Sequence, residues 1–296
     1  MKKDLLTLME LSRGELMEII ENSFRIKKNP GKYSDAMKNK SLALLFQKRS
    51  TRTRCSFEAG MARMGGHTIY MDWNSVQIDR AKIGDEMKCF SRYVDLIAAR
   101  VNEHEVIKEM AATSEIPVIN ALCDKFHPCQ AIADLTTIKE KKGGFGIKLA
   151  YIGDGNNVCN SLMIGCSLMG IKTAVAAPKG YEPLQEVLKF AKDAELTNNP
   201  EEAVKDADVV YTDTWVSMGN EREEAKRLKA FRPYQVNAQM MKLAKKDAIF
   251  MHCLPAHRNF EVTDEVIDSK QSAVFDQAEN RMHTEKALIL KMLGRM

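Results

Sequence analysis

The feature that most constrains the fold of this chain is a regular alternation of short apolar segments with longer amphipathic ones. Short apolar segments are typical of buried strands, and segments with apolar residues three and four positions apart are typical of helices. The alternation predicts an α/β fold in which helices cover both faces of parallel sheets. The expected strands span residues 41–46, 67–71, 95–99, 117–120, 147–152, 172–176, 208–211 and 248–251.

A charged run that ends in two glycines, residues 139–144, marks the best candidate for a domain boundary. We predict two doubly wound parallel-sheet domains joined by bridging helices, one of them at about 129–142. The final helix, 277–293, could belong to either half, and we assign it to the first. The predicted domains are therefore 1–134 plus 277–296, and 135–276.

The composition is typical of a soluble globular protein, since 45% of the 296 residues are hydrophobic and 28% are charged. A net charge of +4 is too weak to indicate nucleic-acid binding, and no apolar segment approaches the ~18 residues of a membrane span. The seven cysteines are irregularly spaced and include no CxxC pair, which argues against a disulfide framework and a structural zinc site. Reduced thiols fit a cytoplasmic location best.

Three hydroxyl groups and two arginines lie where the first expected strand gives way to a helix, in the segment Ser50-Thr51-Arg52-Thr53-Arg54. Backbone N–H groups at a helix start are unpaired and carry partial positive charge. Hydroxyl donors and guanidinium groups added there favour a doubly charged oxyanion such as phosphate. The alternative is a Ser/Thr helix cap beside two solvated arginines, because capping is the commoner use of Ser and Thr.

Polar clusters follow five further expected strands. Ligands of open α/β sheets bind outside the carboxyl ends of the strands, which is where these clusters lie. Together with the segment 50–54, they suggest a single cleft between the two halves. The five clusters are Arg100, 127–130, 154–157, 213–219 and 252–255.

Each cluster also has a simpler explanation. Arg100 could form a salt bridge with a nearby glutamate, and His127 could simply precede a helix that begins with Pro128. Gly153-Asp154-Gly155 resembles a dinucleotide-binding loop, but the third glycine is missing and no acidic residue ends the next strand, which disfavours NAD. Cys253 could be a small buried side chain, although its place at a strand end makes a functional thiol a serious alternative.

Four blocks of the sequence carry a resemblance to a known family. They are Phe46-Gln47-Lys48-Arg49-Ser50-Thr51-Arg52-Thr53-Arg54, His127-Pro128-Cys129-Gln130, Asp213-Thr214-Trp215-Val216-Ser217-Met218-Gly219 and His252-Cys253-Leu254-Pro255. With these motifs in this order, the chain resembles the aspartate/ornithine carbamoyltransferases over essentially its whole length.

The resemblance implies an enzyme that transfers the carbamoyl group of carbamoyl phosphate to the δ-amine of L-ornithine, which gives L-citrulline and phosphate. It implies no metal and no organic cofactor. It also implies a homotrimer, or a multiple of trimers, with active sites at the subunit interfaces. No nucleic-acid or membrane partner is implied.

The resemblance further implies roles for individual residues. The residues expected to be catalytic are Arg52, Arg100, His127, Asp213 and Cys253. The expected carbamoyl phosphate site comprises Ser50, Thr51, Arg52, Thr53, Gln77, Arg100, His127, Pro128, Cys129, Gln130, Cys253, Leu254 and Arg281, with Gln77 lent to a neighbouring subunit. The expected ornithine site comprises Asn157, Asp213, Ser217 and Met218.

Two alternatives stay open at this point. The acceptor could be N-acetylornithine or putrescine, and the acetylornithine relatives use a tryptophan from the loop that holds Trp73 here. The intact Ser217-Met218-Gly219 segment favours plain ornithine, and putrescine would leave Asp213 and Asn157 without α-amino and α-carboxylate groups to bind. The other alternative is a catalytically silent assembly subunit, against which the retained catalytic Arg, His and Asp residues argue.

Overall fold

The computed structural model describes residues 4–78, 82–216 and 223–296. They form two compact units, of which the first extends to Ala133 and includes Glu279–Met296, while the second comprises Asp134–Ala278. The chain passes from one unit to the other within helices α5 (Pro128–Lys142) and α12 (Val274–Met292). Within the described ranges, no helix is both long enough and apolar enough to cross a membrane.

The first unit contains a sheet of four parallel strands in the order β2-β1-β3-β4. The strands are β1 (Ser41–Phe46), β2 (His67–Asp72), β3 (Leu96–Arg100) and β4 (Val118–Leu122). Phe46 pairs with Arg100, and Arg100 pairs with Leu122, so β1, β3 and β4 end level with one another. The loops that follow these strands therefore start at the same edge of the sheet.

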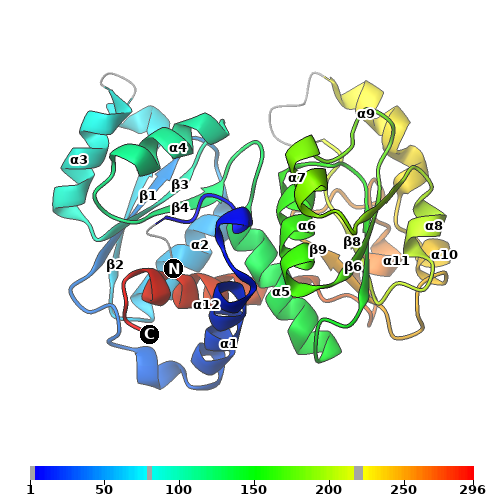
Figure 1. The fold of residues 1–296 in the computed structure, drawn as a ribbon, viewed down its shortest axis with the longest axis horizontal. Helices are drawn as coiled ribbons and strands as arrows, with labels where there is room; N and C mark the ends of the chain where they lie inside the picture. Colours follow the sequence, from blue (N-terminus) through cyan, green and yellow to red (C-terminus); the bar gives the residue numbers. More distant parts are fainter. Residues whose placement is uncertain (1–3, 79–81, 217–222) are drawn as a thin grey trace. The chain divides into compact units, whose positions relative to one another are not determined.

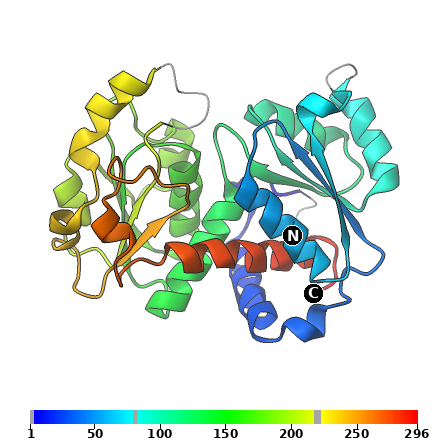
Figure 2. The same ribbon diagram turned by 180° about the vertical axis from the view of Figure 1, so that it is seen from behind.

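Helices cover both faces of this sheet. In both views, α3 and α4 lie on one side of it, and α1 and α2 lie on the other (Figures 1 and 2). A capping box opens α1, because Ser12 accepts the N–H of Glu15 and Glu15 accepts the N–H of Ser12. The helical elements are α1 (Arg13–Lys28), α2 (Thr51–Ala62), α3 (Ile83–Tyr93) and α4 (His104–Thr113), with 3-10 turns η1 (Leu8–Glu10), η2 (Pro30–Tyr33) and η3 (Trp73–Ser75).

The second unit contains a sheet of five parallel strands in the order β7-β6-β5-β8-β9. The strands are β5 (Lys148–Ile152), β6 (Lys172–Ala176), β7 (Glu195–Thr197), β8 (Val209–Thr212) and β9 (Ile249–His252). Ile152 pairs with Thr212, and Thr212 pairs with His252, so β5, β8 and β9 also end level. The residues directly after these strands are consequently neighbours at one sheet edge.

Helices cover both faces of the second sheet as well, with α6 on one side and α8, α10 and α11 on the other (Figure 1). Val204, Met241 and Val266, from the latter three helices, are buried in one apolar cluster with Ile152 and Phe250 of the sheet. This packing fixes the strands whose carboxyl ends carry the polar residues. The helical elements are α6 (Asn157–Met169), α7 (Gln185–Phe190), α8 (Pro200–Val204), α9 (Glu224–Phe231), α10 (Ala238–Met241) and α11 (Asp264–Ile267), with the 3-10 turn η6 (Arg232–Tyr234).

The predicted fold class is confirmed, since each unit has a parallel sheet with helices on both faces. Every expected strand is present within two residues of its predicted bounds. The structure adds β7, which the sequence did not indicate because this strand has only three residues and its first two, Glu195 and Leu196, are exposed. Such a segment shows no apolar run for a sequence pattern to detect.

Candidate active site

The loop between β1 and α2 places hydroxyl groups at the start of a helix. Ser50 is the N-cap of α2, and its hydroxyl oxygen accepts the N–H of Thr53 at 3.3 Å. The Ser50 hydroxyl also donates to the hydroxyl of the buried Thr53 at 3.0 Å. The capping interpretation is therefore right for Ser50. One capping bond satisfies a single N–H of the first turn, so capping is compatible with an oxyanion bound at the same helix start.

The two arginines of this segment point to different partners. Arg52 is half-buried, and its positive charge acts on the imidazole of His127. Arg54 donates from Nε to Glu58 at 3.0 Å, and its guanidinium lies 3.8 Å from the centre of the Tyr70 ring. A neighbouring ring and carboxylate hold the guanidinium of Arg54, which is not among the expected ligands of carbamoyl phosphate. Arg52 is the candidate anion ligand.

Arg100 and His127 lie in the same unit as this loop and are both buried. Burial lowers the pKa of His127 well below its usual value, and the charges of Arg281, Arg100 and Arg52 lower it further. His127 is therefore a neutral imidazole at neutral pH, close to three guanidinium groups. Such a set suits a small ligand that has both a phosphate and a carbonyl oxygen, because the cations balance negative charge and a neutral ring nitrogen can donate a hydrogen bond.

Arg281 of α12 fixes the side chain of Gln130 in α5. Its Nη1 donates to Oε1 of Gln130 at 2.7 Å, while Nη2 and Nε donate to the buried Glu285 at 2.7 Å and 3.2 Å. Burial raises the pKa of Glu285, and the charge of Arg281 opposes that shift. Next to Gln130, burial raises the pKa of Cys129 to about 12, so this thiol stays neutral and belongs to the interior of the unit.

Other predicted site residues lie elsewhere in the first unit or outside the described ranges. Gln77 follows η3 on an exposed loop, and its role in a neighbouring subunit stays a prediction. Trp73 is 8% exposed, so its ring belongs to the interior of its own unit and does not project from the loop. Ser217 and Met218 lie outside the described residues.

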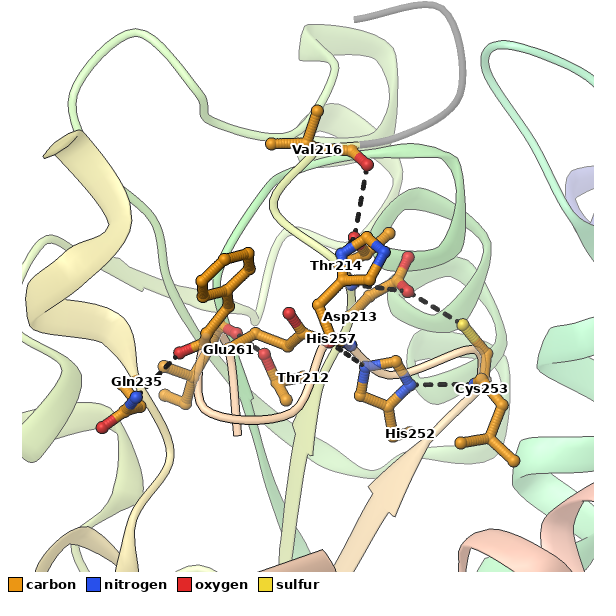
Figure 3. A network of polar contacts seen from close by, with 12 residues as sticks. Thr212, Asp213, Thr214, Val216, Gln235, His252, Cys253, His257 and Glu261 are labelled. Atoms are coloured by element: carbon orange, nitrogen blue, oxygen red, sulfur yellow. Dashed lines mark hydrogen bonds and ion pairs between the residues drawn. The ribbon is translucent and has the colours of Figure 1, made fainter. Parts of the chain in front are cut away.

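In the second unit, Asp213 and Cys253 follow the neighbouring strands β8 and β9. The thiol of Cys253 points toward the carboxylate of Asp213 (Figure 3) and donates to its Oδ1 at 3.0 Å. The same oxygen accepts the N–H of Thr214 at 2.8 Å. A buried carboxylate held in this way can bind an ammonium group and keep it in a fixed place.

Asn156 is a functional candidate that the sequence reasoning missed in favour of Asn157. It is the N-cap of α6: its Oδ1 accepts the N–H groups of Val158 and Cys159 at 3.0 and 3.1 Å. Its Nδ2 donates to Oδ2 of Asp213 at 2.8 Å. The available signal was an asparagine directly before a helix, which favours a cap. Asn157 is the first residue of the helix and is half-buried.

The ring of His252 stabilises the turn after β9 by hydrogen bonding to its backbone. Its Nδ1 accepts the N–H of Leu254 at 2.8 Å, and its Nε2 lies 3.1 Å from Oε1 of Glu261 (Figure 3). An Nδ1 that accepts carries no proton, so the proton is on Nε2 and is donated to the Glu261 carboxylate. Leu254 has a φ of 58°, an uncommon conformation for a residue of its size. His252 thus supports the backbone between Cys253 and Leu254.

Asp213, His252 and Cys253 are the described group whose donor atoms lie close enough together to hold a metal ion. Both ring nitrogens of His252 already have partners, and the Cys253 thiol donates to Asp213. A metal would need to replace these bonds before it gained ligands. The arrangement suits a polar network with one thiol better than a cation site.

A buried arginine of α9 contacts residues that follow β5 and β8. Arg227 of α9 forms an ion pair with Asp154, which comes shortly after β5, and donates from Nε to the carbonyl of Trp215 at 2.7 Å. The Arg227 guanidinium also lies 4.8 Å from the ring centre of Tyr181. Burial raises the pKa of Asp154 to about 6, although Arg227 opposes the shift. Arg227 thereby connects α9 to the backbone of Trp215 and to the carboxylate of Asp154.

Gly155 explains why the glycines after β5 are not those of a dinucleotide site. A Cβ on Gly155 would lie 2.3 Å from the backbone nitrogen of Pro183 and 2.4 Å from the carbonyl carbon of Glu182. In a dinucleotide-binding loop, the corresponding glycine makes room for a pyrophosphate. Here the protein's own backbone fills that room, which agrees with the expectation against NAD.

The family models for aspartate/ornithine carbamoyltransferase match both parts of the chain, the carbamoyl-P binding domain at residues 3–140 and the Asp/Orn binding domain at 145–292. The ornithine carbamoyltransferase of Bacillus subtilis is 52% identical over 301 residues, covering 98% of this chain and 94% of that protein. A Pyrococcus furiosus protein named "Ornithine carbamoyltransferase, anabolic" is 49% identical over 304 residues, covering 99% and 96%. The solved structure of ornithine carbamoyltransferase from Pyrococcus furiosus has a TM-score of 0.93 at 49% identity, covering 97% of this chain and 96% of that one. This chain therefore belongs to the aspartate/ornithine carbamoyltransferase family.

Proposed function

We propose that this chain is a carbamoyltransferase that moves the carbamoyl group of carbamoyl phosphate to the δ-amine of L-ornithine, yielding L-citrulline and phosphate. The observation that carries the proposal is the buried neutral His127 close to Arg52, Arg100 and Arg281. This combination suits a doubly charged phosphate joined to a neutral carbamoyl group. The similar proteins named above, all ornithine carbamoyltransferases, support ornithine as the acceptor.

In the first unit, we assign the phosphate to the start of α2 and to Arg52. The helix start and the Ser50 and Thr51 positions supply N–H and hydroxyl donors, and Arg52 stabilises the charge that builds on the leaving phosphate. We assign the carbamoyl end to Arg100, His127 and Gln130. Arg100 and the neutral His127 donate toward the carbonyl oxygen, which becomes an oxyanion when the amine attacks.

In the second unit, we assign the amino acid to the Asp213–Cys253 pair. Asp213 pairs with the positively charged α-amino group, and Cys253 and Asp213 orient the δ-amine. The δ-ammonium group must lose a proton to attack, after which its nitrogen bonds to the carbamoyl carbon. The nitrogen then gives up a second proton, which the departing phosphate can take, as the bond from the carbamoyl carbon to the phosphate oxygen breaks. Holding two substrates in register accounts for much of the rate gain in such a reaction.

A different argument disfavours each of the three alternatives, which are N-acetylornithine, putrescine and a silent assembly subunit. N-acetylornithine would fit if a tryptophan projected from the loop at 73, but Trp73 is buried inside its own unit. Putrescine has no α-amino or α-carboxylate group, so it would leave Asp213 without its proposed partner. A silent assembly subunit would have no need for a neutral imidazole held among guanidinium groups.

We further propose a homotrimer in which Gln77 of one subunit completes the site of the next, and a cytoplasmic location with reduced thiols. The resemblance of the sequence supports the trimer, and seven cysteines without a disulfide among them fit a reducing compartment. We also propose a role in arginine synthesis, which the name of the Pyrococcus furiosus relative supports.

The experiment that tests the function is citrulline formation from carbamoyl phosphate with ornithine, N-acetylornithine or putrescine as acceptor. We expect turnover with ornithine. Arg52→Ala should lower kcat by about 10²–10³-fold, as is usual when one preorganised donor is removed. Cys55→Ala is the matched control, because Cys55 is exposed on the same helix. No turnover with ornithine, or equal activity of the two variants, would contradict the proposal.

A further inference from the structure

The loop that follows Arg100, the last residue of β3, is bonded to the loop that carries His127 by a group of residues outside the assigned ligand contacts. We call His104, Cys123, Asp124 and Phe126 the tether cluster. The N–H of His104 donates to Oδ1 of Asp124 at 2.7 Å, and the rings of His104 and Phe126 meet edge to face at 5.1 Å. Beside them, the N–H of Val101 donates to the carbonyl of Leu122 at 2.9 Å.

The sulfur of Cys123 lies at the centre of this cluster. It is 3.4 Å from Nδ1 of His104, and it accepts the N–H of Phe126 and the Nδ2 group of Asn120, each at 3.3 Å. The backbone adds a tight turn, because the N–H of Cys123 donates to the carbonyl of Phe126 at 2.9 Å. A single side chain thus joins the end of β4, the loop that leads to His127, and the first residue of α4.

The chemistry of the cluster fits a structural support and not a nucleophile. Cys123 is 0% exposed, and burial raises the pKa of its thiol. Burial and the nearby charge of Lys125 lower the pKa of His104. At neutral pH, the pair is therefore a neutral thiol beside a neutral imidazole. It places no additional charge near the guanidinium groups of the site.

We propose that Cys123 and His104 are positioning residues that hold His127 against Arg100 and so shape the carbamoyl end of the substrate site. Cys123 lies four residues before His127, and His104 lies four residues after Arg100. A bond between Cys123 and His104 therefore limits how far the loop that carries His127 can move from the loop that follows Arg100. The proposal rests on the proposed function, because it needs carbamoyl phosphate as the substrate.

We call the loop between β1 and α2, residues 47–50, the phosphate loop. A different set of bonds connects it to Arg100. The N–H of Gln47 donates to the carbonyl of Arg100 at 2.8 Å, and Oε1 of Gln47 accepts the N–H of Asn102 at 2.7 Å. Neither bond involves the tether cluster. Loosening the tether should consequently disturb the carbamoyl end of the site and spare the helix start that binds phosphate.

The test compares four variants of the full-length chain. Cys123→Ala removes the sulfur, Cys123→Ser keeps a donor and acceptor, and His104→Phe keeps the ring contact with Phe126 but lacks Nδ1. Cys166→Ala is the control, since Cys166 is a buried thiol in α6 of the second unit. Steady-state citrulline formation gives kcat/KM for carbamoyl phosphate, and inhibition by inorganic phosphate gives a separate measure of the phosphate loop.

We expect Cys123→Ala and His104→Phe to lower kcat/KM for carbamoyl phosphate by about tenfold, because shifts of ~1 Å in a positioned group cost up to about 10². Inhibition by inorganic phosphate should stay near the wild-type value, Cys123→Ser should recover most of the loss, and Cys166→Ala should match the wild type. Unchanged kcat/KM in both tether variants would overturn the inference. So would an equal loss of phosphate binding, because that is the signature of a general structural defect. Wild-type turnover in the same assay tests the proposed function separately.

Discussion

Replacement of Asn156 separates its two structural roles, which are to cap α6 and to bind the carboxylate of Asp213. Its Oδ1 caps α6 by accepting two N–H groups, and its Nδ2 donates to the Asp213 carboxylate at 2.8 Å. Loss of an N-cap costs about 1 kcal/mol, and loss of a hydrogen bond to a charged group costs about 1.5–3 kcal/mol. Asn156→Ala should therefore lower the free energy of unfolding by about 3 kcal/mol. Asn156→Ser keeps a capping oxygen but is too short to reach Asp213, so it should recover only the part of the unfolding free energy that comes from the cap, about 1 kcal/mol.

Asn156→Asp gives the sharper comparison. It keeps the cap, because aspartate and asparagine are equally good there, but it sets a second carboxyl group against Asp213. Two adjacent carboxylates raise the pKa of one of them. A raised pKa in the folded state means that stability is lost as the pH rises, so this variant should gain stability relative to wild type when the pH falls from about 8 to about 5.

The assays are denaturant unfolding of the three variants at several pH values and KM for ornithine at saturating carbamoyl phosphate. We expect KM to rise for Asn156→Ala and Asn156→Ser alike, because both release one oxygen of Asp213. Equal stability of Asn156→Ser and wild type, with an unchanged KM, would refute the idea that Asn156 positions Asp213. An Asn156→Asp variant with no pH dependence beyond that of wild type would refute the proposed contact between the two side chains.

Three further predictions concern the second unit. Burial raises the pKa of Asp154 from 3.8 to about 6, and a carboxyl group with a raised pKa in the folded state loses stability as the pH rises. Wild type should therefore lose roughly 3 kcal/mol of unfolding free energy relative to Asp154→Asn between about pH 4 and above pH 6. Parallel pH profiles of unfolding for the two proteins would contradict this. Gly155→Ala should destabilise by more than about 2 kcal/mol in thermal or urea unfolding, because its Cβ meets backbone at 2.3 Å, while Gly144→Ala, which meets nothing within 4 Å, should not. Gln277→Leu should lower the free energy of unfolding by about 3 kcal/mol or more, because buried Gln277 donates to Asp134 and Tyr211 and accepts the N–H of His252. The control is Gln185→Leu at an exposed position, and equal urea midpoints for the two variants would count against the network.

Strand positions were predictable because they depend on local apolar runs, and the end of each strand indicated where polar ligands gather. Asn156 was not predictable as the partner of Asp213, because the contact joins loops 57 residues apart. The pattern of residues 50–54 did not separate the roles of Arg52 and Arg54, because only the pairing of β1 with β2 brings Tyr70 beside Arg54. The sequence indicates which residue types face an edge, whereas the choice of partner depends on tertiary packing.

The same reasoning explains why the supporting residues of the site escaped detection. Gln47 accepts the backbone N–H of Asn102, and the backbone N–H of His104 donates to Asp124. The sulfur of Cys123 lies beside Nδ1 of His104. Gln47 lies within a block that resembles the family, but nothing in that block indicates its bonds to another loop, and His104 and Cys123 lie outside the four blocks. Their roles depend on β1, β3 and β4 being adjacent and ending level, which is a property of the assembled sheet.

The most direct test of the central claim is a crystal structure with a bisubstrate analogue that joins a phosphonate to ornithine. We predict the phosphonate at the start of α2 with Arg52, the carbonyl oxygen near Arg100 and His127, and the α-amino group on Asp213. A phosphonate bound away from residues 50–53, or an amino group that does not touch Asp213, would contradict the account.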